Sequence, residues 1–421
     1  MNKLLLNAFG VLFPFYPLLA WAFHFVNDKP MSFYLNLLML PLALYLLVTA
    51  PNRLPKYVVY FLLFTLYHVG STFITDTIPK DQNKIFFIFA DFNVVACSYL
   101  IIMANTVFDE KFMRRMNRNI FIIVIISLLV SIVQIKDPMF FFNTAIDMES
   151  YVGAEDTRNA SIYSWTGINS SGITFPVLIA ILLNFYRPGS RAFILIVISG
   201  IVVSFLTRAR FVMLSALVVF SQLIFARGVS LFKAISLIAV FVGGLYAMIY
   251  VSGELGFDVE EVISSRILEK DNEMGSAKAR VTSYEVFLKV FPENPVFGVG
   301  PETRQDVKDL LGDEAPMIHV GYLSYLYFYG IIGSSLLFLA LYHMMRNAWQ
   351  VGKTHGFWGS FYGLVAFAFA NATFVYFNFS EMGILLAAMY LYYYNSIYPV
   401  TENETTEPGK EGETGTRFIY T

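Results

Sequence analysis

The chain has 421 residues, of which 57% are hydrophobic and only 14% are charged, and its formal net charge is −2. This composition is too apolar for a soluble protein of that length, and it predicts an integral membrane protein. The sequence has no basic arm and no aromatic-basic stripe, which argues against a nucleic-acid partner. The single cysteine, Cys97, lies in an apolar run, so the chain has no intrachain disulfide and no thiol metal cluster.

Apolar runs recur along almost the whole chain. Because a bilayer core of roughly 30 Å accommodates about 20 apolar residues per helix, they predict an all-α polytopic fold with about twelve transmembrane helices. Whether the seventh and eighth runs are separate helices stays open. The runs are 4–25, 32–50, 57–75, 85–107, 119–135, 168–186, 192–206, 211–226, 231–252, 318–342, 357–377 and 382–398.

The domain organisation follows from the distribution of charge. Lysine and arginine occur in every second connection between the runs, which places those connections and both termini in the cytoplasm. Residues 1–398 then form one transmembrane domain, with a long, acidic and partly helical outer loop at 253–317. Residues 399–421 are polar and lack periodicity, which predicts a disordered cytoplasmic tail.

One helix is predicted within the long outer loop. Apolar residues recur at helical spacing from residue 276 to residue 291, and Pro292 ends the pattern. We expect the apolar stripe to pack back onto the membrane domain. Its members are Val281, Tyr284, Leu288 and Phe291.

A Pro/Gly turn follows this helix and precedes an isolated histidine. Glu293, Asn294 and Pro295 lead into Gly298 and Gly300, which permit positive φ or a close backbone approach. Two glycines at this spacing are, by themselves, weak evidence for a functional motif.

His319 stands at the entrance of the apolar run 318–342, where it is either a general base for a hydroxyl or a satisfied interfacial histidine. The other histidines have no such context and no metal-ligand spacing. They are His24, His68, His343 and His355.

Three arginines are candidate anion ligands. Arg208 and Arg210 lie between two apolar runs with no acidic residue nearby in the sequence, and Arg280 lies in the predicted loop helix. A guanidinium group binds phosphate through two parallel hydrogen bonds, so these side chains suit a diphosphate. The structural alternatives are snorkelling of Arg208 and Arg210 to the membrane interface, and pairing of Arg280 with Glu285.

Two acidic residues also lie at or within apolar runs. Asp91 falls inside the fourth run, and Glu381 lies next to the last one. An acid at membrane depth is a functional candidate by default, but it can instead pair with an arginine from another helix.

The segment from Arg280 to Gly333 resembles the signature region of the O-antigen ligase and O-antigen polymerase superfamily. It reads RVTSYEVFLKVFPENPVFGVGPETRQDVKDLLGDEAPMIHVGYLSYLYFYGIIG. Members of that superfamily have an arginine-led loop helix, an NPxxGxG turn and a histidine just before GYL and GIIG. The resemblance extends over roughly residues 165 to 340, where Thr207-Arg208 is similar to the family's Ser-Arg. Arg210 doubles that arginine, and Val320 stands where the family commonly has asparagine.

The resemblance implies a membrane glycosyltransferase of the bacterial inner membrane with a periplasmic active face. It implies a glycan donor linked to polyprenyl diphosphate, diphosphate binding by Arg208, Arg210 and Arg280, and His319 as the acceptor base. It implies no nucleotide sugar, cofactor or metal. A growing carrier-linked glycan as acceptor would make the protein a polymerase, with a chain-length regulator as a further partner, and a lipid A-core acceptor would make it a ligase.

Polymerase is the favoured interpretation, because the departures at Arg210 and Val320 suit the more divergent polymerases. A polysaccharide flippase or transporter is the alternative from another class, and a non-catalytic assembly protein is a third. Transporters typically have paired halves and charges at the membrane midplane. Here the candidate charges gather on one predicted face beside a single long loop, which favours chemistry at that face.

The predicted topology can be tested with reporter fusions. A reporter active only in the cytoplasm should be silent when fused at Lys308 and active when fused at Glu404, because these positions lie on opposite sides of the membrane. Equal signals from the two fusions would contradict the predicted orientation.

Overall fold

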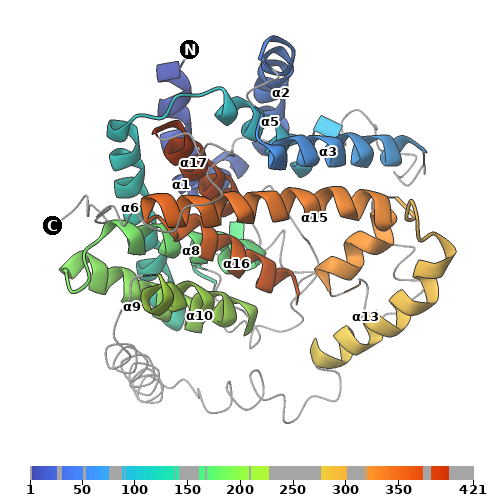
Figure 1. The fold of residues 1–421 in the computed structure, drawn as a ribbon. Helices are drawn as coiled ribbons and strands as arrows, with labels where there is room; N and C mark the ends of the chain where they lie inside the picture. The colour runs from blue at the N-terminus through green and yellow to red at the C-terminus, as the bar shows by residue number, and fades with distance from the viewer. Residues whose placement is uncertain are drawn as a thin grey trace, which may run out of the picture.

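The structure is a computed structural model that describes residues 2–25, 31–50, 54–74, 88–89, 91–137, 139–141, 161–165, 168–207, 210–226, 276–300, 318, 320–372 and 381–397. Across these ranges every regular element is helical and none is a strand, which confirms the predicted all-α class (Figure 1). The helices are α1 (Asn2–His24), α2 (Met31–Thr49), α3 (Lys56–Ile74), α5 (Phe92–Ala104), α6 (Glu110–Lys136), η3 (Ser161–Trp165), α8 (Ile168–Phe185), α9 (Arg191–Leu206), α10 (Arg210–Phe225), α13 (Ser276–Val290), η5 (Phe291–Glu293), α15 (Gly321–His355), α16 (Gly359–Asn371) and α17 (Met382–Ile397).

Within the described residues, 5 helices are long and apolar enough to cross a membrane, namely α1, α2, α3, α6 and α15. The other apolar helices are shorter, and the predicted run 231–252 lies outside the described residues. The total of about twelve spans therefore remains a prediction. Helices α9 and α10 are separate, which answers the question that the sequence left open.

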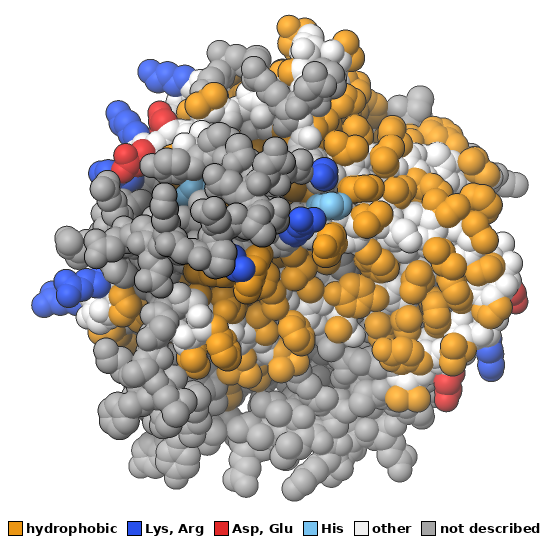
Figure 2. Space-filling model, viewed as in Figure 1, with side chains coloured by type: hydrophobic (Ala, Val, Ile, Leu, Met, Phe, Trp, Pro, Cys, Tyr) orange, Lys and Arg blue, Asp and Glu red, His pale blue; other side chains and the backbone are white. Residues whose placement is uncertain are grey.

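The surface of the bundle suits contact with lipid. Hydrophobic side chains cover a broad area of the face shown in Figure 2. Among the described residues, the large apolar side chains of Leu63 and Leu66 on α3 and of Ile331 and Leu339 on α15 are exposed. A soluble protein rarely exposes so extended an apolar surface, so this face is expected to contact lipid.

The centre of the bundle is formed by α8 and α17, which are buried on nearly all sides. Helix α16 and helix α17 approach α8 closely through glycine. A Cβ atom at Gly383 would lie 2.7 Å from the Cα of Thr174, and one at Gly359 would lie 2.8 Å from the Cα of Ile181. Small residues at such contacts are typical of helix packing in membranes.

Helix α15 lies along α3 and is broken in its first half (Figure 1). Gly330 has φ 59° and ψ −166°, which is far from helical geometry. In an unbroken helix the amides of Ile331 and Ile332 would donate to the carbonyls of Tyr327 and Phe328. The break therefore leaves two donors and two acceptors without their helical partners.

The turn at 295–300 supplies the missing partners. The amides of Val299 and Gly300 donate to Tyr327 O (3.1 Å) and Phe328 O (2.8 Å), which lie before the break. The amides of Ile331 and Ile332, after the break, donate to the carbonyls of residues 295 (2.9 Å) and 296 (3.2 Å). The turn is thus spliced into the helix, and each lost helical bond is replaced by two bonds to the turn.

The splice needs glycine on both sides. Gly298 has φ +73°, and a Cβ atom there would lie 2.4 Å from Phe328 O. A Cβ atom on Gly330 would lie 2.4 Å from Val296 O. No side chain fits at either position, because the two backbones are already in contact.

The loop helix α13 has the predicted length but packs through a different face. The predicted stripe is wrong for three of its four residues, since Val281, Tyr284 and Leu288 are exposed. Instead, Phe287 and Val290 form a small apolar cluster with Ile318 and Tyr327, and Phe291 packs against it. The splice fixes the C-terminal end of α13 beside α15, and Phe287 and Val290 lie on the side of α13 that faces this cluster.

The predicted tail at 399–421 lies outside the described residues, as do residues 253–275 and 301–317 of the predicted outer loop.

Gly298→Ala tests the splice. We expect a loss of at least about 2 kcal/mol in the free energy of unfolding, because the new methyl group adds backbone strain and also collides with Phe328 O. Gly189→Ala is the matched control, since Gly189 also has positive φ (+89°) but a Cβ atom there would meet nothing within 4 Å. The measurement is thermal unfolding of the purified protein in detergent. Equal midpoints for the two variants would contradict the splice.

Candidate functional site

The sequence proposed six site residues, and the structure describes some of them fully, some only in their backbone and some not at all. Gly298 and Gly300 are fully described and have φ values of +73° and +96°, as their predicted role in the turn requires. Arg210 is the first residue of α10, and Arg280 lies in the first half of α13. Their side chains, and all of Arg208 and His319, lie outside the described residues.

The helix ends that carry these residues gather at one end of the bundle. Phe211, next to Arg210, packs on Gly172 near the start of α8. Thr174 on α8 contacts Glu381 and Gly383 at the start of α17. The N-terminal parts of α8, α10 and α17 are therefore neighbours.

The start of α15 lies at this same end. The hydroxyl of Tyr322, in the first turn of α15, donates to Ala368 O near the end of α16 (2.6 Å). Ser215 on α10 lies 3.5 Å from Ala366 O, so α16 joins the start of α15 to the start of α10. The element that follows His319 and the element that begins with Arg210 thus share one end of the bundle.

The chain on both sides of His319 is held firmly. Ile318 and Val320 are 2% and 3% exposed. The Ser324 hydroxyl donates to Ile318 O (2.7 Å), which ties the first turn of α15 back to the residue before the histidine. Val320 occupies the N-cap position and makes no side-chain cap, so Ser324 provides the local hydrogen bond at this helix entrance.

The loop helix with Arg280 is fixed to the same entrance. The cluster of Phe287, Val290, Ile318 and Tyr327 joins the end of α13 to the residue before His319. The spliced turn adds four backbone hydrogen bonds between this connection and α15. The end of α13 is thus joined to the α15 entrance through side chains and to the break in α15 through the backbone of the turn.

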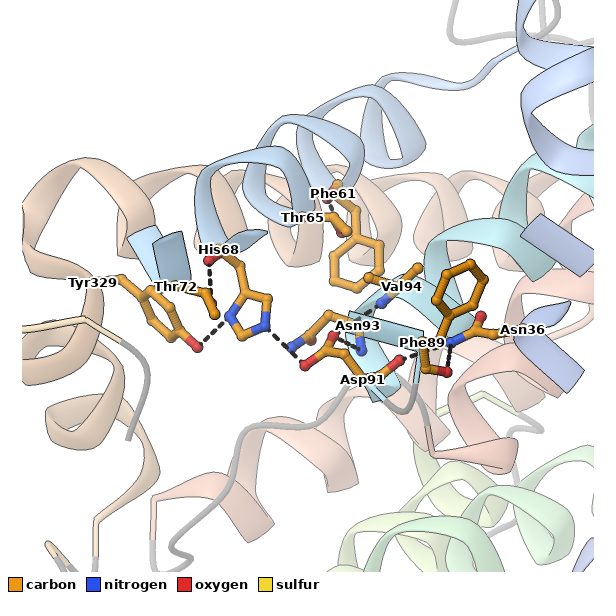
Figure 3. A network of polar contacts seen from close by, with 10 residues as sticks. All are labelled: Asn36, Phe61, Thr65, His68, Thr72, Phe89, Asp91, Asn93, Val94 and Tyr329. Atoms are coloured by element: carbon orange, nitrogen blue, oxygen red, sulfur yellow. Dashed lines mark hydrogen bonds and ion pairs between the residues drawn. The ribbon is translucent and has the colours of Figure 1, made fainter. Parts of the chain in front are cut away.

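A buried polar network lies beside the splice (Figure 3). His68 Nδ1 is 2.7 Å from the Tyr329 hydroxyl, and His68 Nε2 is 2.8 Å from Asp91 Oδ2. The side chains of His68 and Asp91 are only 5% and 11% exposed. The sequence singled out Asp91 but not its partner, which is a histidine of α3 rather than an arginine. Residues 23 positions apart on two helices carry no local sequence signal of pairing.

Glu381 is a second acid at this end. Its Oε2 atom accepts a hydrogen bond from the Thr174 hydroxyl (3.1 Å), which itself accepts the amide of Gly383 (3.2 Å). These bonds connect the starts of α8 and α17.

No group of three or more His, Cys, Asp or Glu side chains in the described ranges could hold a metal ion. The metal-independent chemistry expected from the sequence remains a prediction. Cys97 is a free, buried thiol.

A comparison with protein families gives a match over the central part of the chain. Residues 176–338 match a family model described as O-Antigen ligase, and this match includes α10, α13, the spliced turn and the first half of α15. No curated protein matches the chain. The match confirms the resemblance noted in the sequence, and it assigns this central part of the chain to the O-antigen ligase and polymerase superfamily.

Proposed function

We propose that the protein transfers a glycan from a polyprenyl-diphosphate carrier to an acceptor hydroxyl at the periplasmic face of the bacterial inner membrane. The observation that carries this proposal is the joining of α13 to the α15 entrance within the segment that matches the O-antigen ligase family. That family supports a membrane glycan transferase in the broad sense.

The leaving group in this reaction is a diphosphate, and charge develops on it as the bond to the sugar breaks. Arginine side chains stabilise such charge through paired hydrogen bonds. Arg210 begins α10, where the helix dipole adds to its attraction for an anion. We assign diphosphate binding to Arg280 together with Arg208, Arg210 or both.

His319 is the proposed general base. In the transfer step the acceptor oxygen forms a bond to the anomeric carbon, and the bond from that carbon to the diphosphate breaks. The acceptor proton passes to His319, and the carrier leaves as its diphosphate. No nucleotide, cofactor or metal is needed in this scheme.

The identity of the acceptor distinguishes two versions of the proposed function, a polymerase and a ligase. We favour a polymerase, whose acceptor is another carrier-linked glycan, because the chain departs from the family pattern at Arg210 and Val320. A ligase is the second candidate, because the matching family model carries that description. Incubation of the purified protein with carrier-linked repeats, with and without lipid A-core, separates the two by the product formed.

The same assay tests the enzyme class. In detergent there are no two sides between which to transport a glycan, so new glycosidic bonds are expected only from an enzyme. Carrier-linked repeats that stay unchanged with either acceptor would contradict the proposed function and favour a flippase.

The diphosphate clamp predicts that Arg280→Lys is strongly impaired, because lysine keeps the charge but loses the paired hydrogen bonds. Loss of one such contact is worth about 2 to 4 kcal/mol, or roughly 30-fold to 1000-fold in rate. Lys289→Ala, which removes an exposed cation from the same helix, is the matched control and should be active. The clamp is refuted if Arg280→Ala, Arg208→Ala and Arg210→Ala all work at the wild-type rate.

If His319 is the general base, the His319→Ala variant should have a transfer rate about 100-fold to 10,000-fold lower than wild type, while the protein still accumulates in the membrane. His319→Gln should be equally impaired, because glutamine keeps hydrogen bonding but takes no proton at neutral pH. His343→Gln, at the other end of α15, is the control. Near-normal transfer by His319→Gln would leave His319 a positioning residue at most.

A further inference from the structure

Two consecutive residues of α3 hold Tyr329, the last residue before the break in α15. The Tyr67 hydroxyl donates to the carbonyl of Tyr329 (3.2 Å) and to that of Phe297 in the turn (2.7 Å). His68 Nδ1 lies 2.7 Å from the Tyr329 hydroxyl. Tyr329 is therefore held through its backbone and its side chain, directly beside Gly330.

His68 is in turn held by Asp91. One carboxylate oxygen of Asp91 lies 2.8 Å from His68 Nε2, and the other accepts the amides of Asn93 (2.8 Å) and Val94 (3.1 Å) at the start of α5. A carboxylate can only accept, so Nε2 carries a proton and donates to Asp91, and Nδ1 lies within hydrogen-bond distance of the Tyr329 hydroxyl. Hydrogen bonds from His68 and from the backbone of α5 thus converge on the Asp91 carboxylate and connect α15 to the start of α5 (Figure 3).

Such a network is costly to maintain in an apolar bundle. Ionisable side chains at membrane depth are rare and lie where they have a function or a specific partner. An apolar trio would pack α3, α5 and α15 together without that cost. The polar side chains of Asp91, His68 and Tyr329 instead hold the three helices in a single defined arrangement, because each hydrogen bond fixes both a distance and a direction.

We propose that Asp91 and His68 are positioning residues for the glycan transfer. By fixing the Tyr329 hydroxyl they set the break at Gly330. Through the spliced turn they also set the place of the Arg280 helix relative to the entrance that follows His319. This inference rests on the proposed function, because it concerns the alignment of the groups assigned there. A displacement of about 1 Å between reacting groups costs on the order of 100-fold in rate.

Asp91→Asn and Tyr329→Phe test the inference. Asparagine can still accept the two amides of α5, but its amide nitrogen cannot accept, so the hydrogen bond from Nε2–H is lost unless the ring proton moves to Nδ1. Tyr329→Phe keeps the ring and removes the hydroxyl. Each variant should lower kcat on the order of 100-fold and leave KM for the carrier-linked donor close to the wild-type value. The double variant should lose no more than the worse single variant, because both changes break one network.

Tyr390→Phe is the matched control. It removes the hydroxyl of another buried tyrosine, which is hydrogen-bonded to Asn117 on α6, away from the splice. It should lower the thermal midpoint about as much as Tyr329→Phe does while keeping kcat. The positioning role is overturned if all three single variants have the same kcat, or if the losses from Asp91→Asn and Tyr329→Phe multiply in the double variant.

The wild-type protein in the same assay separates this inference from the proposed function. A wild type that forms no glycosidic bonds refutes the function, and the positioning role falls with it. An active wild type, an inactive Arg280→Ala variant and fully active Asp91→Asn and Tyr329→Phe variants refute the positioning role alone.

Discussion

A backbone amide or carbonyl in an apolar environment must find a partner, and this constraint determines the structure around the candidate site. The break at Gly330 separates the amides of Ile331 and Ile332 from the carbonyls that they would bond in an unbroken α15. The turn at 295–300 satisfies all four groups, and it can do so only because glycine at 298 and 330 lets the two backbones touch. The loop helix is therefore held by the backbone itself, whatever its side chains contribute.

Around this contact the structure adds support in successive layers. Tyr67 bonds to both sides of the splice, and His68 and Asp91 extend the contact to α5. On the other side, Phe287 and Val290 bury the end of α13 against Tyr327. A site that must align two chain segments for chemistry benefits from such support, because small displacements of reacting groups are expensive in rate.

Sequence reasoning succeeded where the signal was local. Apolar runs gave the helices, Pro292 gave the end of α13, and Gly298 and Gly300 gave positions of positive φ. It failed where a contact with a residue far away in the sequence determines the local structure. The run from residue 321 to residue 342 looks uniformly helical, and only the turn explains its break. The exposed stripe of α13 and the pairing of His68 with Asp91 likewise depend on contacts that no periodicity encodes. Arg208 and His319 lie outside the described residues, so their roles remain predictions.

The splice also bears on how the protein can change during evolution. Residues 301–317 begin and end at anchored points, since Gly300 is bonded to Phe328 and Ile318 is buried in the small apolar cluster. Closing a longer loop between fixed ends costs little, because the entropy of closure grows only with the logarithm of loop length. Insertions and substitutions in this stretch are thus insulated from the alignment of α13 with α15.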